Sequence, residues 1–184
     1  AIALEMAHYY EGIGKTVTVI QRSEHLLTGM DHDLADTLQE ALEARGMKIF
    51  CGTSIEQVET TDDGLKKITF SHGDQKTAVE AEEILCALGR RPNTEHLQAD
   101  KAGIELDKGK IAVDKAMQSS CAHIFAAGDV ASPHEIVHIA IDQGEKAATN
   151  AAKHLKGESS DTFLKMDYRM KLYGIFTEPQ VASV

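Results

Sequence analysis

Gly128 and Asp129 form the residue pair in this chain that is best suited to binding chemistry. They follow the apolar run 124–127, which predicts a short strand ending in a tight turn. An ionised aspartate only accepts hydrogen bonds, so Asp129 could hold a ligand hydroxyl, and Gly128 would let that ligand approach closely. The alternative is that Asp129 caps the next helix, which favours the same residue type.

The opening residues 1–5, Ala-Ile-Ala-Leu-Glu, are similar to the second half of a dinucleotide-binding fingerprint. In the complete motif, unpaired amides and the helix dipole attract a pyrophosphate to the helix N-terminus. The alternative is an ordinary helix, because Ala3 is simply a good helix former. The half-motif alone does not decide between the two.

Gln21, Arg22 and Ser23 follow the β-branched run 16–20, at the point where a dinucleotide fold selects its adenosine ribose. A carboxylate there would accept two ribose hydroxyls, whereas an arginine would meet a 2′-phosphate. Neither Gln21 nor Arg22 is acidic, and Glu24 comes later, so the pattern favours NADPH over NADH. The alternative is that Arg22 is a solvated surface residue.

The elements that must position these residues alternate along the chain. Apolar spacing predicts a helix over 2–10, a buried parallel strand over 16–20, a helix ending at Arg45 and a strand over 47–52. This order is typical of a right-handed parallel α/β unit.

The alternation of helices and strands then gives way to consecutive strand candidates. Between residues 54 and 86, the strand candidates IEQVETT, LKKITFS and TAVEAEEILCAL, separated by turn clusters at 62–64 and 72–74, predict an antiparallel insertion. Short strands over 109–114 and 123–130 and a long helix over about 135–155 are expected beyond it. The predicted fold class is α/β and Rossmann-like.

Three segments resemble the flavoprotein disulfide reductases, a family that includes dihydrolipoamide dehydrogenase, glutathione reductase and mercuric reductase. They are IALEMA at 2–7, ALGRRPN at 87–93, similar to the family's A-x-G-R-x-P-N crossing, and IFAAGDV at 124–130. The last is similar to the segment that delivers an aspartate to the FAD ribityl chain. Their order and approximate spacing match the family across nearly the whole chain.

The resemblance implies roles for residues that would bind NAD(P)H. Ala1 would lie at the nicotinamide pocket and leave it open, and Ile2 beside it would also belong to the cofactor-binding residues. Glu5 would lie near the nicotinamide and pair with a lysine outside this chain; the alternative is a surface glutamate. Gly89 would let the backbone approach the dinucleotide. Arg90 would neutralise phosphate or cover the cofactor, unless it forms only a surface salt bridge.

The resemblance also implies contacts with FAD. Asp129 would bind the ribityl chain, beside Gly128. Ile136, Val137 and His138 would begin the long helix, whose backbone amides point at the flavin pyrimidine carbonyl and stabilise negative charge. A backbone or packing role is expected for His138 rather than general-base catalysis. No catalytic residue and no metal ligand is assigned.

The implied activity is hydride transfer from NAD(P)H to FAD and onward to a small-molecule or disulfide acceptor. Residues 173–184 resemble the opening of the family's dimerisation domain, which implies a homodimer. Cys51, Cys86 and Cys121 form no C-x4-C or C-x2-C pair and are expected to be reduced, packed thiols. Two alternatives remain: an NAD(P)H oxidase or ferredoxin or quinone reductase without a redox disulfide, and a non-enzymatic nucleotide-binding redox sensor.

The chain is acidic and has no long apolar run. Nineteen basic against 29 acidic residues give a net charge of −10, which disfavours nucleic-acid binding. No apolar run approaches the roughly 20 residues of a membrane span, so a cytoplasmic protein is expected.

We expect an internal piece of a longer protein: an NAD(P)-binding domain over 1–92 without its first strand and glycine turn, a returning FAD-domain segment over 93–160, and a linker with the start of a dimerisation domain over 161–184. We expect no turnover from this piece alone.

Overall fold

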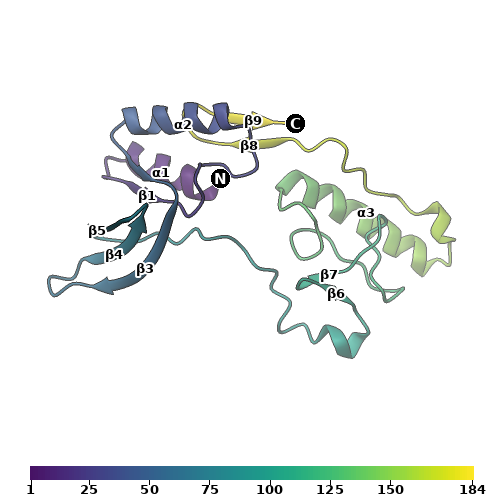
Figure 1. Cartoon of the computed structure of the whole chain (residues 1–184). Coiled ribbons are helices and arrows are strands. Elements are labelled where there is room, and N and C mark those ends of the chain that lie inside the picture. The colour runs from purple at the N-terminus through teal and green to yellow at the C-terminus, as the bar shows by residue number, and fades with distance from the viewer. The chain divides into compact units, whose positions relative to one another are not determined.

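The computed structural model describes residues 1–184, which divide into two compact units (Figure 1). The first unit comprises Ala1–Leu88 together with Leu172–Val184, and the second comprises Gly89–Lys171.

The first unit begins with the expected alternation of helices and strands. Its elements are α1 (Ile2–Gly12), β1 (Thr18–Ile20), α2 (His32–Ala44) and β2 (Lys48–Phe50). β1 and β2 pair in parallel, with Val19 opposite Ile49, which confirms the predicted α/β unit. β1 is only half-buried, whereas the sequence predicts a buried strand. The parallel sheet of the first unit consists of these two strands.

The amphipathic pattern of α2 explains its packing. Ala35, Leu38 and Leu42 recur at helical spacing, and all are buried in the core of the first unit. Gly46 follows the helix with a φ of 96°, a backbone conformation that glycine adopts without strain. The apolar face of α2 thus packs in the same core as Val19 of β1 and Ile49 of β2.

The antiparallel insertion is a three-stranded sheet in the order β3-β4-β5. Its strands are β3 (Thr53–Thr60), β4 (Lys66–His72) and β5 (Gln75–Ala81). The predicted third strand was expected to run on to residue 88, and that part of the prediction is wrong. Residues 82–88 have no strand to pair with, and Ile84, Leu85 and Leu88 are exposed.

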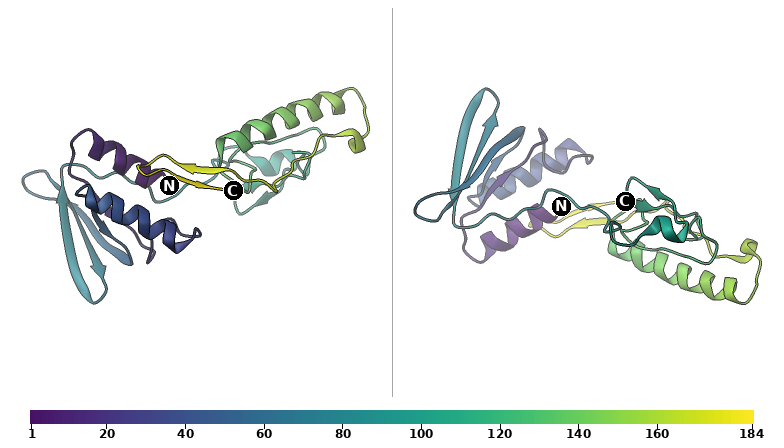
Figure 2. Two further views of the ribbon diagram at one scale, coloured as in Figure 1. Left: turned by 90° about the horizontal axis from the view of Figure 1, so that it is seen from above. Right: turned by 90° about the horizontal axis from the view of Figure 1, so that it is seen from below.

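A hairpin of β8 (Tyr173–Ile175) and β9 (Val181–Ser183) also belongs to the first unit. Ile175 and Val181 are buried in the same core as Leu4 and Leu42. Figure 2 shows this hairpin beside the start of α1. Residues from both ends of the chain therefore complete one core.

The second unit is organised around one long helix. Its elements are η1 (Ala99–Ala102), β6 (Leu106–Asp107), β7 (Lys110–Ile111), α3 (Val137–Leu155) and η2 (Ser160–Thr162). The expected long helix is thereby confirmed. One face of α3 is buried through Ile139, Gln143, Ala147 and Asn150.

Two strand predictions in the second unit are wrong or too long. The segment 109–114 contains the two-residue strand β7 and one isolated bridge from Val113 to Ser119, and 123–130 has a single bridge between Phe125 and Gln118. The reason is local: Ile124 donates to Cys121 and Ala126 donates to Met117, so the backbone amides are used in turns and loop contacts. The segment still ends in the turn that the sequence indicated.

The three cysteines are free, in agreement with the expected reduced thiols. Their expected packing is not general, because Cys86 is exposed while Cys51 and Cys121 are half-buried. Cys86 lies in the unpaired segment that follows β5, which explains its exposure.

Candidate functional site

The turn at Gly128 and Asp129 projects a carboxylate toward the surface of the second unit. Gly128 has a φ of 78°, and its carbonyl accepts hydrogen bonds from the Ala131 and Ser132 amides. The Asp129 side chain is 34% exposed, and its Oδ2 lies 2.8 Å from Nη2 of Arg90. A ligand hydroxyl can therefore reach this carboxylate beside a positive charge.

Asp129 does not cap the following helix. The N-cap residue of α3 is Ile136, which has an extended backbone, and no side chain bonds to this end of the helix. The capping alternative for Asp129 is thereby excluded. Its side chain instead pairs with Arg90, as the salt-bridge alternative for Arg90 foresaw.

The start of α3 offers backbone donors. The first amides of a helix have no partner within the helix, and here no side chain supplies one. The side chains of Val137 and His138 are exposed, and that of Ile136 is half-buried. A carboxylate acceptor and a helix N-terminus on one unit fit a ligand that carries both hydroxyl and carbonyl groups.

Lys110 also contacts the segment between the turn and α3. The Lys110 ammonium lies 2.8 Å from the carbonyl of Ser132 and 3.1 Å from Oε1 of Glu135. Burial lowers the pKa of His134, with smaller contributions from Lys171 and Lys110. The Lys110 ammonium therefore binds the segment that joins the turn to α3 through the Ser132 carbonyl and the Glu135 carboxylate.

Sequence reasoning did not identify Ser132 and Gln143, two fully buried polar residues beside the turn. Gln143 accepts a hydrogen bond from the Gly128 amide at 2.8 Å and donates to the Ser132 hydroxyl at 3.0 Å. One signal was available: Gln143 lies on the same helical face as Ile139 and Ala147, where a polar side chain is unexpected.

Ala1, Ile2 and Glu5 lie together at the start of α1 in the first unit. The Ala1 carbonyl accepts the Leu4 and Glu5 amides, and Ile2 is 51% exposed. Oε1 of Glu5 accepts the Phe176 amide at 3.0 Å. Glu5 is therefore bound to the segment after β8 instead of being a free surface carboxylate.

Gln21, Arg22 and Ser23 lie at the carboxyl end of β1, as expected. The Gln21 amide donates to the Phe50 carbonyl at 2.7 Å, and the Ser23 carbonyl accepts the Gly52 amide at 2.8 Å. Arg22 is exposed and forms no ion pair. These bonds align the ends of the two parallel strands and leave the Arg22 side chain free.

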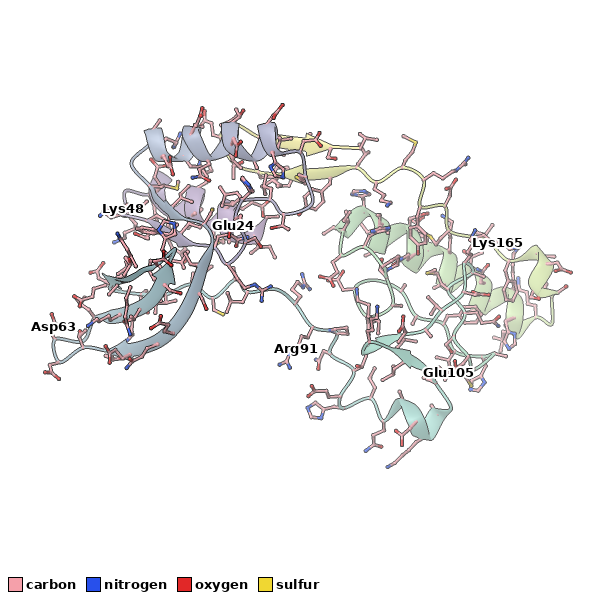
Figure 3. All side chains as sticks on the ribbon, viewed as in Figure 1. Glu24, Lys48, Asp63, Arg91, Glu105 and Lys165 are labelled. Carbon is pink, nitrogen blue, oxygen red and sulfur yellow. The ribbon has the colours of Figure 1, made fainter.

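Glu24 lies closer to the strand ends than its position in the sequence indicated. A Cβ added to Gly52 would lie 2.7 Å from Oε2 of Glu24, so the carboxylate covers this glycine. Glu24 also helps to line a pocket of about 200 Å³ formed by residues 23–30 and His32. Figure 3 labels Glu24 in the first unit.

Two sets of predicted site residues result, one on each unit. The set on the first unit consists of Ala1, Ile2, Glu5 and residues 21–23. The set on the second unit consists of Gly89, Arg90, Gly128, Asp129, Ile136, Val137 and His138. No group of three or more His, Cys, Asp or Glu side chains is arranged to bind a metal. None of the helices is both long and apolar enough to cross a membrane.

The parallel strand pair, the antiparallel insertion and the turn before α3 define an FAD/NAD(P)-binding oxidoreductase fold. A family model described as pyridine nucleotide-disulphide oxidoreductase matches residues 1–144. The chain belongs to this family, as the sequence resemblance indicated.

Individual relatives agree with this assignment. A dihydrolipoyl dehydrogenase of Thermus scotoductus is 37% identical over 154 residues, which cover 83% of this chain and 33% of that protein. A mercuric reductase of Bacillus cereus is 32% identical over 184 residues, or 100% of this chain and 28% of that protein. This chain therefore spans about a third of the length of these relatives.

Solved structures show the same fold. The crystal structure of LpdA from Mycobacterium tuberculosis has a TM-score of 0.79 and 29% identity, covering 97% of this chain and 37% of that one. The flavoprotein disulfide reductase RclA of Escherichia coli has a TM-score of 0.81 at 24% identity, covering 98% of this chain and 39% of that one, and supports the fold alone.

Proposed function

We propose that the intact protein transfers hydride from NAD(P)H to FAD and passes electrons on to a disulfide or related acceptor. Family membership supports the class of reaction. The observation that carries the proposal is the half-buried Asp129 carboxylate, held in a glycine turn on the same unit as an uncapped helix N-terminus.

FAD fits the groups that the second unit presents. The Asp129 carboxylate would accept a ribityl hydroxyl, and the amides of Val137 and His138 would donate to a pyrimidine carbonyl. The positive end of α3 would stabilise negative charge that develops there on reduction. FAD, when bound, supplies the redox chemistry, while this chain binds, orients and tunes it.

NAD(P)H is proposed to bind the first unit and the crossing at Gly89 and Arg90. The start of α1 would face the nucleotide, with Ala1 and Ile2 at the nicotinamide pocket and Glu5 near the ring. Arg22, exposed and unpaired, would meet a 2′-phosphate, so NADPH is favoured. Glu24 is the competing candidate at the ribose, because its carboxylate lies against Gly52 at the carboxyl end of β2.

We propose the domain division 1–92, 93–160 and 161–184 for the intact protein, with the last part leading into a dimerisation domain of a homodimer. In this chain the hairpin of β8 and β9 packs in the core of the first unit. A cytoplasmic location is proposed from the sequence alone; one relative, the dihydrolipoyl dehydrogenase of Pisum sativum, is mitochondrial.

The test uses the full-length protein, purified with its native flavin content. Under anaerobic conditions, NADPH is expected to bleach the flavin absorbance, and an added small disulfide is expected to restore it. Asp129→Ala protein is expected to purify with little FAD. Nucleotide binding without bleaching would support the redox-sensor alternative, and reoxidation by oxygen alone, with no disulfide reduced, would support the oxidase alternative.

A further inference from the structure

Gln143 is a buried amide whose side chain makes three hydrogen bonds around the Gly128 turn. It is 0% exposed, on the inward face of α3. Its Oε1 accepts the Gly128 amide at 2.8 Å, and its Nε2 donates to the Ser132 hydroxyl at 3.0 Å and the Tyr168 hydroxyl at 2.7 Å. Because the Gly128 amide can only donate, the orientation of the Gln143 side chain is defined.

Ser132 extends this network to the start of α3. Its hydroxyl donates to the His134 carbonyl at 2.6 Å and accepts the His134 amide at 3.0 Å. Together with the bond from Gln143, these contacts use the one donor and both acceptor positions of the hydroxyl. The Ser132 amide in turn donates to the Gly128 carbonyl at 2.7 Å. The backbone from Gly128 to His134 is therefore held at both ends.

The two groups proposed to contact FAD lie on either side of this held segment. Asp129 directly follows Gly128, and the amides at the start of α3 come two to four residues after His134. The Gln143 side chain forms no hydrogen bond with the Asp129 carboxylate or with those amides. It joins the turn to the body of α3, so it determines how the carboxylate is placed relative to the helix N-terminus.

We infer that Gln143 is a positioning residue for FAD: its buried amide fixes the Gly128–Asp129 turn against α3 and so sets the affinity of this unit for the flavin without touching it. This inference rests on the proposed function. Its physical basis is that preorganised groups bind a ligand more tightly, because less order has to be imposed during binding.

Asn150 provides a matched control on the same helix. It is also 0% exposed, and its side chain bonds to the Ala116 carbonyl at 2.9 Å and to the Leu164 carbonyl and amide at 2.8 Å each. Removing it breaks a comparable buried network, but none of its partners is in the turn. A loss of stability alone would therefore affect both variants alike.

The experiment compares Gln143→Leu, Asn150→Leu and wild-type full-length protein after removal and re-addition of FAD. Both variants are expected to have lower melting temperatures as apoproteins. Only Gln143→Leu is expected to raise the dissociation constant for FAD, by roughly tenfold, the usual effect of about one buried hydrogen bond. Hydrogen exchange of the apoprotein should also show faster exchange at the Gly128 amide in Gln143→Leu alone.

Tyr168→Phe is the milder variant in case Gln143→Leu does not fold, since it removes one partner of Gln143 and keeps the ring. A smaller rise in the FAD dissociation constant is expected from it. The inference is overturned if FAD affinity stays within about twofold of wild type in Tyr168→Phe and Gln143→Leu, or if Asn150→Leu weakens FAD equally. Failure of wild-type protein to bind FAD would instead overturn the proposed function.

Discussion

Nη2 of Arg90 lies 2.8 Å from Oδ2 of Asp129, joining two predicted cofactor-binding residues that are far apart in the sequence of the second unit. The Arg90 side chain is 58% exposed and that of Asp129 is 34% exposed. An ion pair this exposed contributes little to folding, at most about 1 kcal/mol. Its importance would therefore lie in binding, which a double-mutant cycle can measure.

In the full-length protein, Asp129→Ala is expected to weaken FAD binding by roughly 10- to 100-fold, the usual effect of losing a hydrogen bond to a charged group. Arg90→Ala is expected to weaken it less. If Arg90 acts only by holding Asp129, the Arg90 effect disappears in the Asp129→Ala background. Fluorescence titration with FAD measures each corner of the cycle. Full additivity would show that Arg90 contacts the cofactor independently.

Arg22→Glu is expected to shift nucleotide preference toward NADH. The exposed guanidinium is replaced by a carboxylate that would accept ribose hydroxyls and repel a 2′-phosphate. The ratio of kcat/KM for NADPH over NADH should fall by roughly tenfold or more. Lys15→Glu, an equal change of charge before β1, should leave the ratio unchanged. An unaltered ratio in Arg22→Glu would remove these residues from the ribose site.

Gly52→Ala tests whether Glu24 belongs to the nucleotide site. The new methyl group would meet the Glu24 carboxylate, the mobile end of a side chain, whereas Gly64 has a similar positive φ with nothing within 4 Å. Both alanine variants should lose about 1 kcal/mol of folding free energy through backbone strain. Only Gly52→Ala should change the dissociation constants for NADH and NADPH. Equal nucleotide affinities in both variants would exclude Glu24 from the site.

The thiols are expected to react in a defined order with iodoacetamide. Burial raises the pKa of Cys51, and the charges of Glu43 and Glu24 raise it further, so less thiolate is present at a given pH. Cys86 is exposed and should be alkylated first in mildly alkaline buffer. Glu24→Gln should speed up alkylation of Cys51 modestly, because one contribution to the raised pKa is removed. Peptide mass spectrometry over time follows each site, and faster labelling of Cys51 than of Cys86 would contradict this order.

Local patterns in the sequence were enough to predict most elements. Helical spacing in 2–10 and 34–42 and the turn clusters of the insertion reflect hydrogen bonds between residues close in the chain. The β-branched run before Gln21 indicated a strand by its composition, although that strand pairs with the distant residues of β2. Two predicted strand segments, 82–88 and 123–130, do not form strands in the structure. Residues 82–88 and 123–130 have apolar composition, but a strand exists only when a second segment supplies its partners.

The sequence by itself determined the family, the α/β order and the types of residue that could bind two cofactors, because these depend on motif identity and local periodicity. Only the tertiary structure decided which of those residues touch. It paired Arg90 with Asp129, bound Glu5 to an amide 171 residues away, and buried Gln143 beneath Gly128. Contacts of this kind form when the chain folds back on itself, and their energies depend on burial and geometry that no local pattern encodes.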